Sequence, residues 1–204
     1  MQLSASKLAV SRGGRTIFAG LSFAVSAGEC LAVTGPNGAG KSTLLRALAG
    51  FLPLCSGAVS LSPATDQSVA EQAHYVGHAE ALKNSLTLNE NLHFLAALLE
   101  AGLGGMPVSA AISQMGLAHA AHLPVAYLSA GQRRRAALAR LLVAKRPLWL
   151  LDEPLTALDE AARGLVAEIM TGHLAEGGLI VAATHAGLGL KSQELKLGAH
   201  PCQG

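Results

Sequence analysis

The stretch Gly35–Thr43, GPNGAGKST, is a glycine-rich run that ends in a lysine and two hydroxyl side chains. It satisfies the pattern GxxxxGK[ST], in which glycines allow backbone N–H groups to wrap around phosphates. Lys41 is placed to reach the β- and γ-phosphates of a nucleotide, and the hydroxyl of Ser42 is placed to bind Mg²⁺. A chance glycine-rich turn is the alternative, but the flanking apolar strand and helix favour a phosphate site. The expected nucleotide contacts are Gly35, Pro36, Asn37, Gly38, Ala39, Gly40, Lys41, Ser42 and Thr43.

Two adjacent carboxylates, Asp152 and Glu153, follow the apolar run Leu148–Leu151. Ligands of open α/β sheets bind at the carboxyl ends of the strands, where these two residues would emerge. We expect Asp152 to hold Mg²⁺ through a water molecule, and Glu153 to polarise a water for attack on the γ-phosphate. An acidic helix cap before Pro154 is the alternative interpretation.

The stretch Leu128–Arg140, LSAGQRRRAALAR, combines small residues with three consecutive arginines. Ser129 and Gly131, just before a helix, would leave backbone N–H groups free to bind an anion. The arginines, residues 133–135, cannot all lie on one face of a helix. We therefore interpret them as solvated or interfacial charge.

Strand-length apolar segments alternate with helical segments along the chain, which predicts an α/β fold with a mostly parallel core sheet. We expect an antiparallel β subdomain at the N-terminus and a helical lobe inserted into the core. The chain would form one domain over residues 1–204, with the core in 1–77 and 141–204 and the lobe in 78–140. The expected strands are Leu3–Val10, Leu21–Val25, Cys30–Thr34, His74–Val76, Leu148–Leu151 and Leu179–Thr184, and the expected helices are Leu44–Ala49 and Glu160–Leu174.

Composition excludes several other classes of function. Half of the residues are hydrophobic, yet no uninterrupted apolar run approaches the roughly 18 residues that span a bilayer. The N-terminus lacks the pattern of a signal peptide, so we expect a cytoplasmic protein. A net charge of +2 and 3% aromatic residues argue against nucleic-acid binding. Cys30, Cys55 and Cys202 and the eight histidines show no metal-ligand spacing, so we expect reduced thiols.

The motifs resemble, in kind and in order, those of the ATP-binding cassette (ABC) ATPases. LSAGQ resembles the signature sequence of that family, Pro154–Asp159 its D-loop region, and Thr184-His185 its switch histidine. The resemblance covers roughly residues 2–197. It implies a P-loop NTPase fold, ATP hydrolysis with Mg²⁺, and a homodimer in which two copies stack head to tail.

In that family each ATP lies between the P-loop of one copy and the signature of the other. By resemblance, Ser129, Ala130, Gly131 and Gln132 would face the γ-phosphate held by Lys41 of a second copy. His185 would contact the γ-phosphate in its own copy and hold the attacking water together with Glu153. It would also sense the loop of Asp159 across the dimer.

Two positions depart from the general family pattern. Arg12 stands where an aromatic residue usually stacks on adenine. A guanidinium can also stack on a base, but an exposed turn residue is an equal alternative. His78 stands at the hinge before the lobe, where transporters have a glutamine that touches Mg²⁺ and water. Because Mg²⁺ prefers oxygen ligands, His78 either acts through a water or has a structural role at the hinge.

The stretch Gly77–Lys83, the segment LTLNENL at Leu86–Leu92 and the sequence LSAGQRRRAALARL together resemble the ATPase subunits of cytochrome c maturation systems. This resemblance implies integral-membrane ABC subunits as partners, contacted through His78–Leu92. It also implies a peripheral position on the cytoplasmic face of the inner membrane, without direct insertion, and a link between ATP hydrolysis and the release of a haem-loaded chaperone.

Two other functions are open on the sequence alone. The first is a soluble ABC ATPase that acts on a protein scaffold, as in iron–sulfur assembly. The second is a nucleotide-gated clamp without catalysis, against which the presence of both Glu153 and His185 argues.

Overall fold

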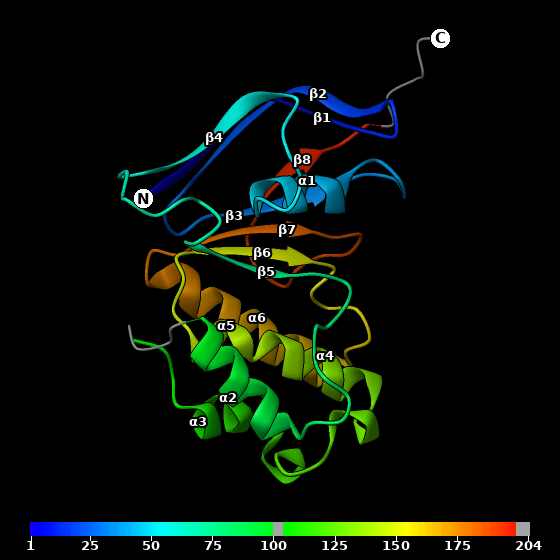
Figure 1. Cartoon of the computed structure of the whole chain (residues 1–204), viewed down its shortest axis with the longest axis vertical. Coiled ribbons are helices and arrows are strands. Elements are labelled where there is room, and N and C mark those ends of the chain that lie inside the picture. Colours follow the sequence, from blue (N-terminus) through cyan, green and yellow to red (C-terminus); the bar gives the residue numbers. More distant parts are fainter. Residues whose placement is uncertain (100–103, 199–204) are drawn as a thin grey trace.

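The computed structural model describes residues 1–99 and 104–198. Within these residues an antiparallel sheet, a parallel sheet and a group of helices follow one another along the long axis of the molecule (Figure 1). The parallel sheet has the strand order β5-β6-β7-β3-β8. Its strands are β3 (Cys30–Thr34), β5 (Ala73–Val76), β6 (Leu148–Asp152), β7 (Leu179–Ala183) and β8 (Gln193–Lys196).

The central strands β6 and β7 are buried along their whole length. Parallel strands covered on both faces are expected to be continuously apolar, and LWLL and LIVAA are. Their side chains alternate between two cores. Leu148 and Leu150 join the core beneath the antiparallel sheet, whereas Trp149 and Leu151 join the core that faces the helices. The sheet is therefore the wall between the two cores.

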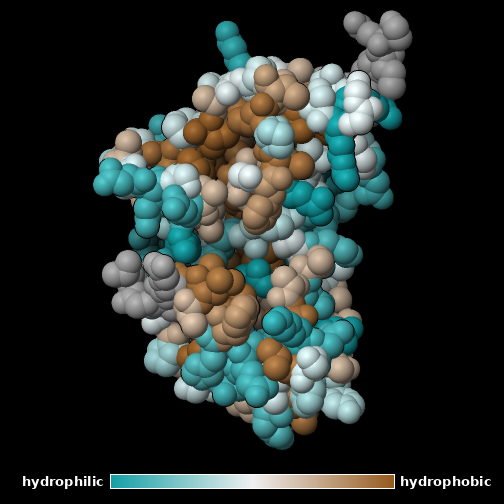
Figure 2. Space-filling view, in the orientation of Figure 1, coloured by the Kyte–Doolittle hydropathy of each residue, from teal (hydrophilic) through white to brown (hydrophobic). Residues whose placement is uncertain are grey.

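The antiparallel sheet, in the order β2-β1-β4, consists of β1 (Gln2–Arg12), β2 (Arg15–Ser26) and β4 (Ser56–Ser62). It packs with helix α1 (Lys41–Leu48) around a core that includes Leu3, Leu8, Leu44 and Leu45, all with no exposed area. Figure 2 shows hydrophobic residues gathered in this upper part of the molecule, whereas the lower end is largely hydrophilic. No helix among the described residues is long and apolar enough to cross a membrane.

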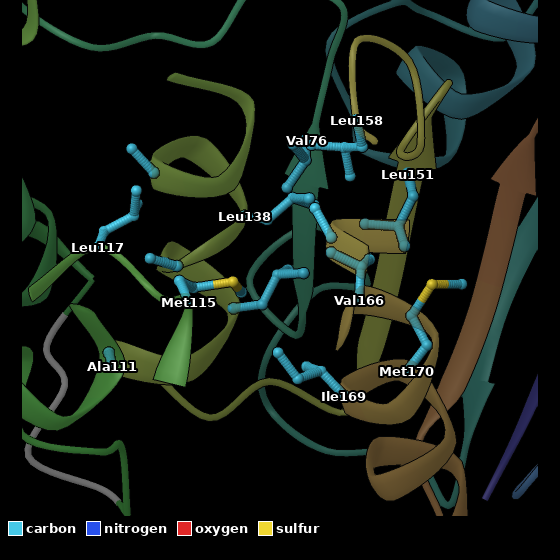
Figure 3. Close-up of a cluster of buried hydrophobic side chains, with 14 of the residues drawn as sticks. Val76, Ala111, Met115, Leu117, Leu138, Leu151, Leu158, Val166, Ile169 and Met170 are labelled. Carbon is cyan, nitrogen blue, oxygen red and sulfur yellow. The ribbon is translucent and has the colours of Figure 1, made fainter. Parts of the chain in front are cut away.

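The second core joins the sheet to the helices. In Figure 3, Val76 and Leu151 of the sheet meet Leu138, while Val166 and Met170 lie on the neighbouring helix. These helices are α2 (Leu88–Leu98), α3 (Val108–Gln114), α4 (Ala130–Leu138), α5 (Arg140–Val143) and α6 (Glu160–Ala175), with 3-10 turns at Ala118–Ala120 and Val125–Tyr127. Because one core spans sheet and helices, the position of α4 is tied to that of β6.

The predicted α/β class, with a parallel core sheet, a separate antiparallel sheet and helices between β5 and β6, is confirmed. Two strands, β4 and β8, were not predicted. Both are largely exposed and lack a continuous apolar run. The first helix begins at Lys41 rather than at Leu44, because the left-handed Gly40 caps it directly after the glycine-rich loop.

Candidate functional site

The glycine-rich loop connects β3 to α1 and is packed against the hairpin of β1 and β2. Gly40 has a φ of 97°, and an added Cβ would lie 2.6 Å from Cγ2 of Ile17. A side chain at this position would therefore meet both a strained backbone and a steric overlap. The glycine allows α1 to begin at the loop, where the first N–H groups of a helix have no partner within the helix and are available to an anion.

Lys41 is 8% exposed, and its ammonium group folds back over the loop. Nζ donates to the carbonyl oxygens of Gly35 at 2.8 Å and Pro36 at 3.2 Å, and lies 3.0 Å from Nε2 of His185. These bonds satisfy a nearly buried cation within its own loop. They also place the ammonium group at the mouth of the loop, where phosphate oxygens can replace the carbonyls.

Asp152 and Glu153 lie at the carboxyl end of β6, as predicted. Asp152 is 3% exposed and accepts a hydrogen bond of 3.0 Å from Oγ of Ser42. Glu153 has a φ of 49°, which a residue with a side chain rarely adopts, and its N–H donates to Ala183. Its Oε1 is buried without a hydrogen-bond partner and lies 3.6 Å from Nε2 of His185. A buried carboxylate oxygen without a partner calls for an explanation, such as a catalytic role or a bound water or ion.

Thr184 anchors the turn that carries His185. Its hydroxyl donates to the carbonyl of Ala186 at 2.7 Å and accepts from the N–H of the same residue at 3.1 Å. The strand therefore ends at Ala183, one residue before the predicted end. His185 itself is about half exposed and faces Lys41 and Glu153.

These groups line one open cavity of about 640 Å³. His78, which is exposed, forms part of its wall. Thr156 and Ala186 also line it and were not named as site residues, although Thr156 lies within the predicted D-loop region Pro154–Asp159. The lining residues are Asn37, Gly38, Gly40, Lys41, Ser42, Thr43, His78, Asp152, Glu153, Thr156, His185 and Ala186.

The signature residues 129–132 lie at the start of α4, and none of them is among the residues that line this cavity. Ser129 is the N-cap and accepts from the N–H of Gln132, whose side chain accepts from the N–H of Ser129. Ser129 and Ala130 are exposed. The signature is therefore a capped helix N-terminus that does not line the cavity of its own chain.

Two further predicted residues lie at the edges of elements. Asp159 is the N-cap of α6, where Oδ1 accepts from the N–H of Ala162 at 2.8 Å. Arg12 is exposed at the tip of the hairpin, paired in register with Arg15, and is not among the residues that line the cavity. The hairpin nevertheless contacts the phosphate loop through Ile17 and Phe18.

The interpretation of the three arginines as solvated or interfacial charge is wrong for Arg134, which is buried within the chain. This residue is 4% exposed, and its guanidinium donates only to backbone carbonyls. Arg133 and Arg135 also donate to carbonyls, those of Leu128 and Met115, at 2.7 and 2.8 Å. Sequence alone could not reveal these partners, because every residue has a carbonyl.

The two cysteines that the structure describes, Cys30 and Cys55, lie outside the cavity. Cys30 is buried in β3, and burial raises the pKa of its thiol to about 12, so that it stays protonated. Cys55 is an exposed free thiol, and Cys202 lies outside the described residues. Neither Cys30 nor Cys55 is among the residues that line the cavity.

Comparison with known proteins agrees with the motifs and the fold. The family model described as ABC transporter matches residues 18–156. The relative from Nitrobacter winogradskyi is 53% identical over 97% of this chain and 98% of its own, and that from Rhodopseudomonas palustris is 52% identical over 98% and 99%. The relative from Bradyrhizobium diazoefficiens is 50% identical over 97% and 98%. All three are named cytochrome c biogenesis ATP-binding export protein CcmA.

Among solved structures, an ABC transporter ATP-binding protein from Pyrococcus furiosus superposes with a TM-score of 0.82. It covers 97% of this chain and 98% of its own, at 20% identity, which shows a common fold. The matches over nearly the full length at 50% identity or more establish a closer relation. The chain belongs to the ABC transporter family, and within it to the group of ATP-binding proteins named CcmA.

Proposed function

We propose that this chain is the ATP-hydrolysing subunit of a membrane ABC complex that serves cytochrome c maturation. The observation that carries the ATPase part is the single cavity that brings Lys41, Ser42, Asp152, Glu153 and His185 together from three strand ends. The names of its near relatives support the assignment to cytochrome c biogenesis and export.

The residues of the cavity suit the phosphates of ATP and one Mg²⁺ ion. Oγ of Ser42 and Oδ1 of Asp152 lie 3.0 Å apart and are oxygen donors, which Mg²⁺ prefers. A bound Mg²⁺ ion would neutralise part of the charge of the phosphates. Ser42 would hold the ion directly and Asp152 through a water. Lys41 would exchange the carbonyls of its own loop for the β- and γ-phosphate oxygens.

Glu153 and His185 are suited to the hydrolytic step. Oε1 of Glu153 has no hydrogen-bond partner and lies beside Nε2 of His185, so both can contact a water in front of the γ-phosphate. Glu153 would accept the proton of that water, and His185 would donate to the γ-phosphate. General-base assistance contributes about 10²–10⁴ in rate. His78 lies on the same cavity wall, where it would act through a water.

The placement of the signature supports a homodimer. Ser129, Ala130, Gly131 and Gln132 begin an exposed helix N-terminus, an anion-binding element that its own cavity does not use. We propose that it binds the γ-phosphate held by a second copy, while Asp159 lies near the same interface. We also propose that residues 78–140 form a helical lobe and that residues 1–77 and 141–204 form the core of the same domain.

A membrane partner accounts for the remaining part of the proposal. The names of the relatives describe export proteins, which favours a membrane complex over a soluble scaffold. We propose that the segment His78–Leu92, which runs from the cavity wall into α2, contacts integral-membrane subunits at the cytoplasmic face of the inner membrane. ATP hydrolysis would then drive haem handling, through release of a haem-loaded chaperone. Arg12 remains a candidate for stacking on adenine.

Light scattering tests the ATPase and dimer proposals together. Glu153→Gln with Mg-ATP should shift from monomer to dimer, because ATP binds but is scarcely hydrolysed. Ser129→Arg in the same background should block the shift by filling the anion site. Ser109→Arg, which places the same side chain at an exposed position of α3, is the matched control and should dimerise. Dimerisation of the Ser129→Arg variant would refute the placement of the signature.

Affinity capture from solubilised membranes tests the membrane partner. Tagged chain, expressed in cells that make cytochrome c, should co-purify with integral-membrane subunits of the cytochrome c maturation complex. Substitutions at the exposed residues Lys83, Asn84 and Ser85 should weaken this association without changing ATP binding, because none of them lines the cavity. Recovery of the chain with soluble scaffold proteins alone, and none of it with membranes, would refute the assignment.

A further inference from the structure

Arg134 is a nearly buried cation that joins three segments around the cavity. Nη2 donates to the carbonyl oxygens of Asp152 at 2.6 Å and Glu153 at 2.8 Å. Nη1 donates to the carbonyl of Gly77 at 2.8 Å, and Nε donates to that of Pro154 at 3.3 Å. One side chain from the signature helix α4 thus binds the end of β6 and the residue that precedes His78.

The backbone at Glu153 needs such support. Its φ of 49° lies in the left-handed region, where residues other than glycine persist only if their surroundings hold them. On one side its N–H donates to Ala183 of β7 at 2.9 Å. On the other side its carbonyl and that of Asp152 accept from Arg134. The direction of the Glu153 side chain follows from this backbone conformation, so both contacts determine where Oε1 lies.

The charge of Arg134 is compensated by its surroundings. Burial lowers the pKa of its guanidinium, while the carboxylates of Glu80, Asp152 and Glu153 oppose this effect. The planar fork of a guanidinium can serve several acceptors at fixed angles, which a lysine ammonium cannot do. The contacts are therefore specific to arginine, although none of their acceptors is a side chain.

We infer that Arg134 is a positioning residue of the ATPase, which fixes the backbone of Glu153 and of the hinge at Gly77 and His78 relative to the signature helix. This inference rests on the proposed ATPase function. Arg134 is not among the described residues that line the cavity, so we place it outside direct contact with the nucleotide. It acts through the residues whose carbonyls it holds.

Steady-state kinetics of three variants test this inference. Arg134→Met should lower kcat by a factor on the order of 10², because small displacements of catalytic groups have effects of that size. The Kd for ATP should change by less than about threefold, since the phosphate loop is untouched. Arg134→Lys should be intermediate. Arg135→Met, the matched control on the same helix, should retain kcat, because the side chain of Arg135 donates to Met115 and Gly116 of the lobe and not to the end of β6.

A second measurement separates positioning from a purely structural role. In the Glu153→Gln background, Arg134→Met should still dimerise with Mg-ATP, because Ser129 and Gln132 cap α4 without Arg134. The inference is overturned if Arg134→Met has the kcat of Arg135→Met, or if kcat, ATP affinity and dimerisation are lost together. If the methionine variant does not fold, wild-type kcat in Arg134→Lys overturns it. An inactive wild type would instead refute the proposed function.

Discussion

Replacing Gly40 with alanine tests whether the β1–β2 hairpin restricts the phosphate loop. Gly40 has a φ of 97°, and its new Cβ would lie 2.6 Å from Cγ2 of Ile17 and 3.4 Å from Cδ1 of Phe18. Ile17 is β-branched, so its Cγ2 can move away only by a change of χ1. The substitution therefore combines backbone strain with an overlap that the neighbour cannot easily relieve.

The two effects can be given separate magnitudes. A left-handed conformation costs a residue with a side chain about 1–2 kcal/mol. Overpacking by a methyl group costs about 1–3 kcal/mol. Gly40→Ala should therefore lower the free energy of unfolding by roughly 2–5 kcal/mol. Gly38→Ala is the matched control, because Gly38 has a φ of 82° and open space around the added Cβ. Gly38→Ala should therefore lower the free energy of unfolding only by the cost of the backbone strain.

Urea unfolding of the nucleotide-free protein provides the assay. In a double-mutant cycle, Ile17→Ala should remove the overlap, so Gly40→Ala/Ile17→Ala should be more stable than the sum of the single variants by about 1–3 kcal/mol. Gly40→Ala should also weaken ATP binding, and the double variant should bind ATP more tightly than Gly40→Ala does. Additivity of the two substitutions within about 0.5 kcal/mol would refute the packing of the hairpin on the loop.

Two further predictions concern histidines. His78→Gln should retain much of the ATPase rate, because glutamine offers an oxygen at the cavity wall; complete loss of turnover with intact ATP binding would contradict this and favour a specific role of the imidazole. His74 is 2% exposed, and burial lowers its pKa from 6.5 to about 4, so the folded state keeps it neutral. Below pH 6.5 the unfolded state binds a proton at His74 that the folded state does not bind until the pH approaches 4. The free energy of unfolding should therefore fall as the pH falls through this range, by about 2 kcal/mol between about pH 7.5 and about pH 5. Urea unfolding of His74→Gln should show a weaker dependence on pH than the wild type, and an unchanged dependence would contradict the assignment.

The residues of the candidate site could be located from the sequence because each belongs to a short motif with a fixed neighbourhood. The glycines, Lys41 and Ser42 occupy one loop, and Asp152 and Glu153 end one apolar strand. Carboxyl ends of parallel strands meet at one edge of a sheet, so the prediction that these motifs share a site needed only the fold class. The structure places them around one cavity.

Other features depended on the tertiary structure. The edge strand β8 could not be predicted, because its side chains are largely exposed and carry no apolar alternation. The start of α1 at Lys41 depends on the left-handed Gly40, whose neighbours in the hairpin come from another part of the chain. The caps of α4 and α6 use residues that the motifs had assigned to a dimer interface.

Arg134 shows most directly the difference between what the sequence predicts and what the tertiary structure decides. The sequence determined that three arginines follow the signature, and helical periodicity showed that they cannot share one face. It could not show which of them is buried, because the acceptors of Arg134 are carbonyls 18, 19, 20 and 57 residues away. Side-chain types record the chemistry of a motif, whereas backbone carbonyls are the same in every residue. Only the packing of α4 against β6 decides which carbonyls a buried guanidinium meets.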